Sequence, residues 1–252
     1  MLLGTDAVIG VVVTLLLALG AVLGRALTPG AGAVAAVFGV VIVVFVGFPF
    51  LALLALFVAA SALATRYRFA EKQRQHVQEG HAGERGVSNV VAHIIIPTGL
   101  AVAGGVSPPL FHSATTALLF ASAIAFGAAD TFASEVGVLA GHAQSILSGK
   151  SVPPGTNGGV SRNGQLAALA ASVTTALVGL GLFWVFGTPL PNMVLFVILV
   201  TAVGFLACQV DSILGELLEN RGTLSKGSIN FLGMLSAVAI SAAVLILTGA
   251  GL

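Results

Sequence analysis

The sequence predicts an all-α integral membrane protein, a polytopic bundle of about eight transmembrane helices. Two observations lead to this fold class. The 252-residue chain is 57% hydrophobic, only 8% of its residues are charged, and its mean hydropathy is +1.08. Soluble domains carry about 25% charged residues, so this composition could not solvate the surface of a soluble globule. The apolar residues also gather in runs of about 20, which is the length that a helix needs to cross a bilayer.

Eight apolar runs follow one another, at residues 6–25, 30–47, 49–65, 87–106, 111–135, 165–187, 192–217 and 229–249. The second and third runs are short, and only Gly47, Phe48 and Pro49 divide them. A proline at this point favours a break between two helices over one long helix. The first run has no basic segment before it and no cleavage site after it, so we expect a retained helix rather than a signal peptide.

The basic residues lie in alternate connections between these runs. Arg25 follows the first run, five Lys and Arg residues lie within 66–86, Lys150 and Arg162 follow the fifth run, and Arg221 and Lys226 follow the seventh. Cytoplasmic loops are rich in Lys and Arg, so eight spans place all of them on the cytoplasmic side, whereas seven would break the alternation. We expect one membrane domain (residues 1–252) in the cell membrane, with both termini outside and long cytoplasmic loops at 66–86, 138–164 and 218–228.

A short motif occurs twice, each time near the cytoplasmic end of an outside-to-inside helix. Residues 130–135 and 211–216 share an Asp, then a hydroxyl residue, a small residue and a Glu at equal spacing. Asp130 and Asp211 should lie at similar depth, and a carboxylate there usually faces a wet cavity because burying it in lipid is costly. Two such groups would repel each other unless a cation joined them, and Mg²⁺ binds one or two carboxylates together with water and phosphates. Structural ion pairs with loop Lys or Arg residues are the alternative.

The fifth connection contains a glycine-rich segment, residues 150–164, that Lys150 and Arg162 bracket. Glycines allow backbone N–H groups to converge on an anion. The segment also precedes a helix expected to begin near Gln165, and helix N-termini attract phosphate. It lacks the Gly-Lys-Ser/Thr ending of a Walker A loop. We predict a phosphate-binding loop, and a simple turn is the alternative.

Other polar residues are expected near the same membrane edge. Arg85 directly precedes a helix on which Asn89 and His93 share one face at i, i+4 spacing. Asn230 opens the last helix. We expect these side chains to hydrogen-bond into the site, with a helix–helix contact as the alternative. The remaining histidines show no metal-ligand pattern: His76, His81, His112 and His142. The net charge of +1 gives no sign of nucleic-acid binding.

Several of these segments together resemble the DUF92 family of membrane proteins, which includes TMEM19-type proteins and plant phytyl-phosphate kinase. The resemblance rests on residues 89–92, 129–137, 155–161, 211–215 and 230–231. It implies transfer of a phosphoryl group from a nucleoside triphosphate, with CTP as the expected donor, to an isoprenoid monophosphate such as phytyl or geranylgeranyl phosphate. The chain departs from the family pattern at His93 and Ile94, where Asn-Gly is expected, and at Glu216 and Glu219.

These residues and the resemblance lead to the hypothesis of an Mg²⁺-dependent kinase. Asp130 and Asp211 would bind the metal, with Glu135 as a further ligand or base. The triphosphate would be held by the glycine-rich loop and by cationic side chains: Thr156, Asn157, Gly158, Gly159, Ser161, Lys150, Arg162 and Arg85. The walls of the site would be Asn89, His93, Thr131, Ser134, Ser212, Glu216 and Asn230. The acceptor phosphate is already anionic, so catalysis would rest on positioning and charge neutralisation.

Two other activities fit the same residues. A cytidylyltransferase would also join CTP and a lipid phosphate, but it would release pyrophosphate and form a CDP-lipid. A membrane transporter could also carry repeated motifs and intramembrane carboxylates, although its site would be expected near the bilayer midplane. The expected partners in all cases include membrane lipids. Spacings of small residues are compatible with an oligomer but are too frequent in this chain to predict one.

Overall fold

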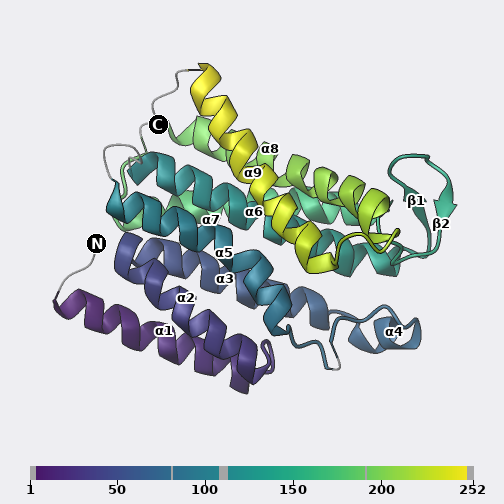
Figure 1. Cartoon of the computed structure of the whole chain (residues 1–252), viewed down its shortest axis with the longest axis horizontal. Coiled ribbons are helices and arrows are strands. Elements are labelled where there is room, and N and C mark those ends of the chain that lie inside the picture. The colour runs from purple at the N-terminus through teal and green to yellow at the C-terminus, as the bar shows by residue number, and fades with distance from the viewer. Residues whose placement is uncertain (1–3, 81, 108–112, 191, 249–252) are drawn as a thin grey trace.

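The computed structural model describes residues 4–80, 82–107, 113–190 and 192–248. The expectation that His81 and His112 are not metal ligands falls outside these residues. Within them, eight helices are long and apolar enough to cross a membrane. They are α1 (Thr5–Leu23), α2 (Pro29–Val46), α3 (Phe48–Arg66), α5 (Val87–Val106), α6 (Ser113–Gly137), α7 (Arg162–Val185), α8 (Met193–Leu214) and α9 (Lys226–Thr248). The predicted all-α, polytopic fold class is confirmed (Figure 1).

The shortest connection between two spans lies between α2 and α3. Gly47 ends α2 with a φ of 91°, a conformation that favours glycine. Its N–H still donates to the Val43 carbonyl at 3.0 Å, and Pro49 then occupies the first turn of α3, where a missing N–H costs nothing. The proline therefore separates two spans, as its position in the sequence predicts.

Helix α6 lies at the centre of the bundle and packs against α3, α5, α7, α8 and α9. Its side chains Phe120 and Phe126 are fully buried. Small residues let the neighbouring helices approach closely: a Cβ added at Gly204 of α8 would lie only 2.7 Å from the Ala125 Cβ of α6. Asp211 follows Gly204 by two helical turns on the same face of α8, so this close contact carries Asp211 toward α6.

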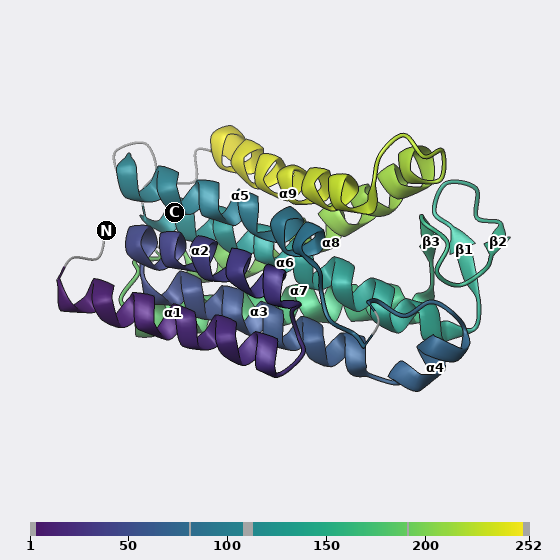
Figure 2. The ribbon, with the colours of Figure 1, turned by 60° about the horizontal axis from the view of Figure 1, so that its bottom comes forward.

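The connections after α1, α3, α6 and α8 lie at one end of the bundle, opposite the ends at which α1 begins and α9 finishes (Figures 1 and 2). They hold or adjoin all ten Lys and Arg residues of the chain. Backbone hydrogen bonds from Arg85 N–H to the Ala26 carbonyl (3.0 Å) and from Thr28 N–H to the Arg85 carbonyl (3.1 Å) tie two of these connections together. Their placement in the cytoplasm stays a prediction from the basic residues.

This polar end contains local structure between the spans, of which the sequence predicts only some helix in the connection after α3. The connection after α3 forms the short helix α4 (Phe69–Arg74), and α8 continues into a π-helical turn, η2 (Gly215–Glu219). After α6 comes a 3-10 turn, η1 (Val138–Ala140), and then three strands, β1 (Ala143–Ser145), β2 (Ser151–Val152) and β3 (Gly159–Val160). The strands form an antiparallel sheet in the order β2-β1-β3, with Ala143 opposite Val152 and Ser145 opposite Gly159. The glycine-rich segment is thus held by a small sheet rather than as a free loop.

Candidate active site

A cavity of about 330 Å³ opens at the polar end of the bundle. Its walls come from α6, α8, α9, the glycine-rich segment and the connection after α4. Eleven of the expected site residues line it: Asp130, Ser134, Glu135, Thr156, Asn157, Gly158, Gly159, Ser161, Asp211, Ser212 and Asn230. The structure therefore brings both aspartate motifs and the glycine-rich segment to one cavity.

The two aspartates reach the cavity from different helices, Asp130 from α6 and Asp211 from α8. Asp211 is 9% exposed, and its Oδ1 atom is buried without a hydrogen-bond partner among the described residues. Gly233 of α9 leaves room for this oxygen, because a Cβ there would lie 2.9 Å from Asp211 Oδ1. A buried carboxylate oxygen without a donor is costly. A divalent cation shared with the nearby Asp130 would satisfy it.

The opposite wall of the cavity is the glycine-rich segment, residues 155–161. Glu216 of η2 anchors the neighbouring strand β1, because Ser145 Oγ donates to Glu216 Oε1 at 2.6 Å. Asn220 holds the segment itself, since its Nδ2 donates to the Asn157 carbonyl at 3.0 Å. Gly158 is strained for any other residue, with φ at 77° and a Cβ position 2.4 Å from the Glu216 Cβ. Glu216 therefore positions the segment against α8, whereas the sequence predicts it as a cavity wall.

We expect Gly158→Ala to displace the glycine-rich segment and to lower phosphate binding by about tenfold or more. The added methyl group would collide with Glu216, and the backbone conformation at this position costs a residue other than glycine about 1–3 kcal/mol. Gly149→Ala is the matched control, since Gly149 has a similar φ of 66° in the same connection but nothing within 4 Å of its Cβ position. Both variants carry the backbone strain. Equal losses in calorimetric binding measurements would show that contact with Glu216 is unimportant.

Hydroxyl groups of the glycine-rich segment hold its own backbone in place. Ser161 caps α7, with its Oγ accepting from Gly164 N–H at 3.2 Å, and Thr156 Oγ1 donates to the Pro153 carbonyl at 2.7 Å. Gly164 allows this end of the segment to approach α6, because a Cβ there would lie 2.8 Å from the Ala133 carbonyl oxygen. The two hydroxyls thus stabilise the segment, whose residues 155–161 line the cavity.

Two expected phosphate-binding cations do not reach the cavity. Lys150 is exposed in the turn between β1 and β2. Arg162 is the exposed first residue of α7, which begins three residues earlier than the sequence predicts. The buried neighbours Ser161 and Gly164 face α6, and Arg162 therefore points away from it. Neither residue lines the cavity, and their role as phosphate ligands stays a prediction.

A second group of expected site residues lies beside the cavity, not on its surface. Arg85 is 8% exposed and donates to Asn89 Oδ1 (3.1 Å) and Thr131 Oγ1 (3.3 Å), while its Nε is buried without a partner in the described part of the chain. His93 is buried, and its Nδ1 bonds with the Asn89 carbonyl at 2.9 Å. Burial lowers the pKa of the Arg85 guanidinium, although nearby carboxylates act in the opposite direction. Arginine stays cationic in proteins. The buried Arg85 charge therefore lies next to Asp130, while the two side chains that accept its hydrogen bonds, Asn89 and Thr131, are neutral.

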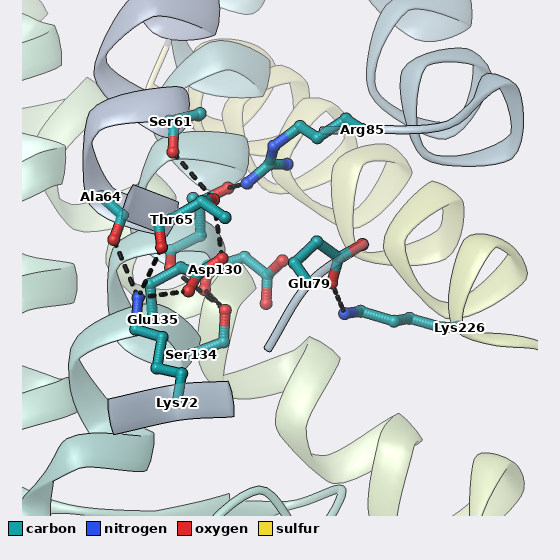
Figure 3. Close-up of polar contacts among 11 residues, drawn as sticks. Ser61, Ala64, Thr65, Lys72, Glu79, Arg85, Asp130, Ser134, Glu135 and Lys226 are labelled. Atoms are coloured by element: carbon teal, nitrogen blue, oxygen red, sulfur yellow. Dashed lines mark hydrogen bonds and ion pairs between the residues drawn. The ribbon is translucent and has the colours of Figure 1, made fainter. Parts of the chain in front are cut away.

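Glu135 forms a buried ion pair with Lys72 (Figure 3). Lys72 of α4, which is fully buried, donates to Glu135 Oε2 at 2.6 Å and to the carbonyls of Ala64 and Thr65 at 2.9 and 3.1 Å. Thr65 Oγ1 donates to Glu135 Oε1 at 2.7 Å. Both carboxylate oxygens thus have protein partners in this structure, and the expected role of Glu135 as a metal ligand or base stays a prediction. Its geometry is that of a residue that fastens α4 to the bundle.

Sequence reasoning missed two charged residues of the cavity, Glu79 and Lys226. Lys226 Nζ and Glu79 Oε2 are 2.9 Å apart, and Figure 3 shows this pair beside Asp130. Burial alone would raise the pKa of Glu79, but the Lys226 ammonium, with a smaller contribution from Arg85, holds it below its ordinary value. Lys226 could have been found, because it precedes Asn230 by four residues and so shares its helix face. No local signal in the sequence marks Glu79.

Within the described ranges, no three His, Cys, Asp or Glu side chains converge to form a metal cage. The fold and the cavity define a multi-pass membrane protein with paired carboxylates facing a glycine-rich segment at one end of its helices. The chain belongs to the family described as integral membrane protein DUF92, whose profile matches residues 12–236. The resemblance seen in the sequence motifs is thereby confirmed.

Three relatives share most of their length with the chain. An uncharacterized membrane protein of Synechocystis sp. is 32% identical over 238 residues, covering 90% of this chain and 88% of the relative. An uncharacterized membrane protein of Methanocaldococcus jannaschii is 27% identical over 200 residues, covering 79% and 77%. Protein PGR of Arabidopsis thaliana is 32% identical over 195 residues, covering 71% and 67%. No solved structure matches the chain.

Proposed function

We propose that the protein is a divalent-cation-dependent kinase that transfers a phosphoryl group from a nucleoside triphosphate, CTP, to an isoprenoid monophosphate such as phytyl or geranylgeranyl phosphate. One observation carries the proposal. Asp130 and Asp211, from two different membrane helices, face the same cavity as the glycine-rich segment 155–161. Carboxylates opposite a glycine-rich backbone suit a phosphate chain bridged to the protein by Mg²⁺.

Asp130 and Asp211 would hold Mg²⁺, since both line the cavity and Asp211 Oδ1 has no other partner among the described residues. When bound, Mg²⁺ neutralises charge on the β- and γ-phosphates. The segment 155–161 would orient the triphosphate, and Arg85 would add positive charge behind Asp130. An oxygen of the lipid monophosphate would attack the γ-phosphorus, and the bond between the γ-phosphorus and the β,γ-bridging oxygen would break. The products are a lipid diphosphate and a nucleoside diphosphate. The acceptor is anionic, so no protein base is required.

The first turns of α9 separate the cavity from an apolar groove of about 510 Å³ between α5 and α9. Lys226 and Asn230 line the cavity, whereas Gly227, Ser228 and Phe231 line the groove. An acceptor lipid could place its phosphate in the cavity and its chain along the apolar surface, where burial of each CH₂ group contributes about 0.8 kcal/mol. This arrangement of polar and apolar surfaces favours a lipid phosphate over a water-soluble acceptor.

The decisive assay uses purified protein in detergent with Mg²⁺, CTP labelled at the γ-phosphate, and geranylgeranyl or phytyl monophosphate. We expect the label to appear in a lipid diphosphate on chromatography of the lipid phase, and EDTA to abolish the product. Label found only in pyrophosphate, together with a CDP-lipid, would identify a cytidylyltransferase. If no nucleotide or lipid phosphate is turned over, the proposal fails, and flux measurements in liposomes would test transport instead.

A further inference from the structure

Two Lys–Glu pairs fix the connection between α3 and α5, and they differ in burial. Lys72 is fully buried, and its ammonium group has two carbonyl acceptors in addition to Glu135. The Lys226 and Glu79 side chains are 55% and 29% exposed, and among the described residues the Lys226 ammonium donates no other hydrogen bond to a protein group. Exposed ion pairs contribute little to stability, whereas buried ones are strongly held once formed. The first pair is therefore a fixed anchor, and the second can be exchanged for another ligand.

Glu79 of the exchangeable pair lies on a strap, residues 76–79, that forms part of the cavity wall, whereas Lys226 begins α9. Both ends of this connection are fixed, one by Lys72 and the other by the backbone hydrogen bonds of Arg85. Between these ends, Val77 lies against the glycine-rich segment, since a Cβ at Gly155 would be 3.0 Å from Val77 Cγ1. Gln78 Oε1 is buried without a partner among the described residues. The strap thus contacts the predicted phosphate-binding segment through Val77 and buries an unsatisfied oxygen of Gln78, which favours its displacement.

The charges that line the cavity also favour exchange of the Lys226–Glu79 pair for another ligand. Within the described part of the chain, Lys226 is the one Lys or Arg residue that lines the cavity, whereas five residues contribute carboxylates: Glu79, Asp130, Glu135, Asp211 and Glu219. A triphosphate needs cationic partners beyond Mg²⁺, and Lys150 and Arg162 do not line the cavity. Glu79 presents a carboxylate to Lys226 in the position where a phosphate oxygen would form the equivalent charge-assisted hydrogen bond.

We propose that Lys226 binds a phosphate of the substrate, and that the Glu79 carboxylate pairs with Lys226 until this phosphate displaces it. Displacement of Glu79 would move the strap away from the glycine-rich segment. The inference rests on the proposed function only in that a polyphosphate occupies the cavity. It adds a substrate-binding cation and a competing carboxylate within the protein. Glu79 would thereby reduce binding of weakly charged anions and neutralise Lys226 when the cavity holds no substrate.

The test compares Glu79→Gln and Lys226→Gln by calorimetric titration of the detergent-solubilised protein with inorganic pyrophosphate and with CTP, each in the presence of Mg²⁺. Removing the competing carboxylate is expected to tighten binding roughly two- to fivefold. Removing the cation is expected to weaken it by at least about tenfold. The matched control is Glu71→Gln, which removes a partly exposed carboxylate that pairs with Arg68 in the same connection. Glu71 does not line the cavity, so this change should leave binding unchanged.

The opposite signs of the two effects are the diagnostic result. If the pair only fastened the strap, both variants would release the same segment and would change binding in the same direction, which overturns the inference while leaving the proposed kinase intact. Tighter binding by Glu79→Gln cannot come from misfolding, so the test holds even if Lys226→Gln folds poorly. A wild-type protein that binds neither pyrophosphate nor CTP would overturn both the inference and the proposed function.

Discussion

Replacing Asp130 with asparagine is expected to reduce kinase turnover by on the order of 10³-fold, because a metal-bound carboxylate supplies several kcal/mol of charge stabilisation to phosphoryl transfer. The amide is nearly isosteric but carries no charge, so it binds Mg²⁺ weakly. The same substitution also removes repulsion between Asp130 and the buried Asp211. The metal-free variant should therefore melt at a temperature at least as high as that of the wild type. Turnover is measured by transfer of label from CTP, and stability by thermal denaturation in detergent.

Asp6→Asn is the control for this substitution. Asp6 is an exposed carboxylate in the first turn of α1, at the end of the bundle opposite the cavity. Both changes remove one negative charge from a membrane helix, but only Asp130 faces the cavity. Near-normal turnover by Asp130→Asn would remove this residue from the catalytic machinery. A large loss in both variants would indicate a general effect of charge rather than metal binding.

Replacing Lys72 with methionine is expected to destabilise the protein by about 3–5 kcal/mol, because the Glu135 carboxylate would remain buried without its counter-charge. The carbonyls of Ala64 and Thr65 would lose the same donor. A marked fall in the melting temperature of the detergent-solubilised protein is the expected result. The double variant Lys72→Met with Glu135→Leu should recover most of the loss, since removing both charges of a buried pair is often close to neutral.

Arg68→Gln provides the comparison, because Arg68 pairs with Glu71 on the exposed surface of the same connection. That pair should be worth only about 0–1 kcal/mol. If Lys72→Met were as mild as Arg68→Gln, the buried pair would not be what fastens α4 to the bundle. Loss of turnover by Glu135→Gln without loss of stability would restore a direct catalytic role for Glu135.

The membrane fold could be predicted because its determinants are local. A run such as residues 192–217 is apolar enough to require lipid, and the break at Pro49 follows from the chemistry of one residue. The alternation of basic connections then fixes which helix ends lie together. The two aspartate motifs could be assigned to one depth in the same way, since a helix rises by a constant distance per residue.

The roles of individual charges could not be predicted in this way. Sequence proximity suggested Lys150 and Arg162 as phosphate ligands, but the small sheet and the cap of α7 direct them outward. Glu135 lies in the same motif as Asp130, yet a lysine 63 residues away neutralises it. Lys226 reaches the cavity from the last helix and pairs with a carboxylate 147 residues distant.

The sequence by itself determined that this chain spans the membrane, where its helices begin and end to within a few residues, and which segments could carry phosphate chemistry. Only the tertiary structure decided which charges face the cavity and which pair with each other. The physical reason is the range of the interactions. Helix formation and membrane insertion depend on neighbouring residues and on lipid, whereas each ion pair depends on how distant segments pack. A few ångströms decide whether a carboxylate such as Glu135 meets a lysine or stays free for a metal.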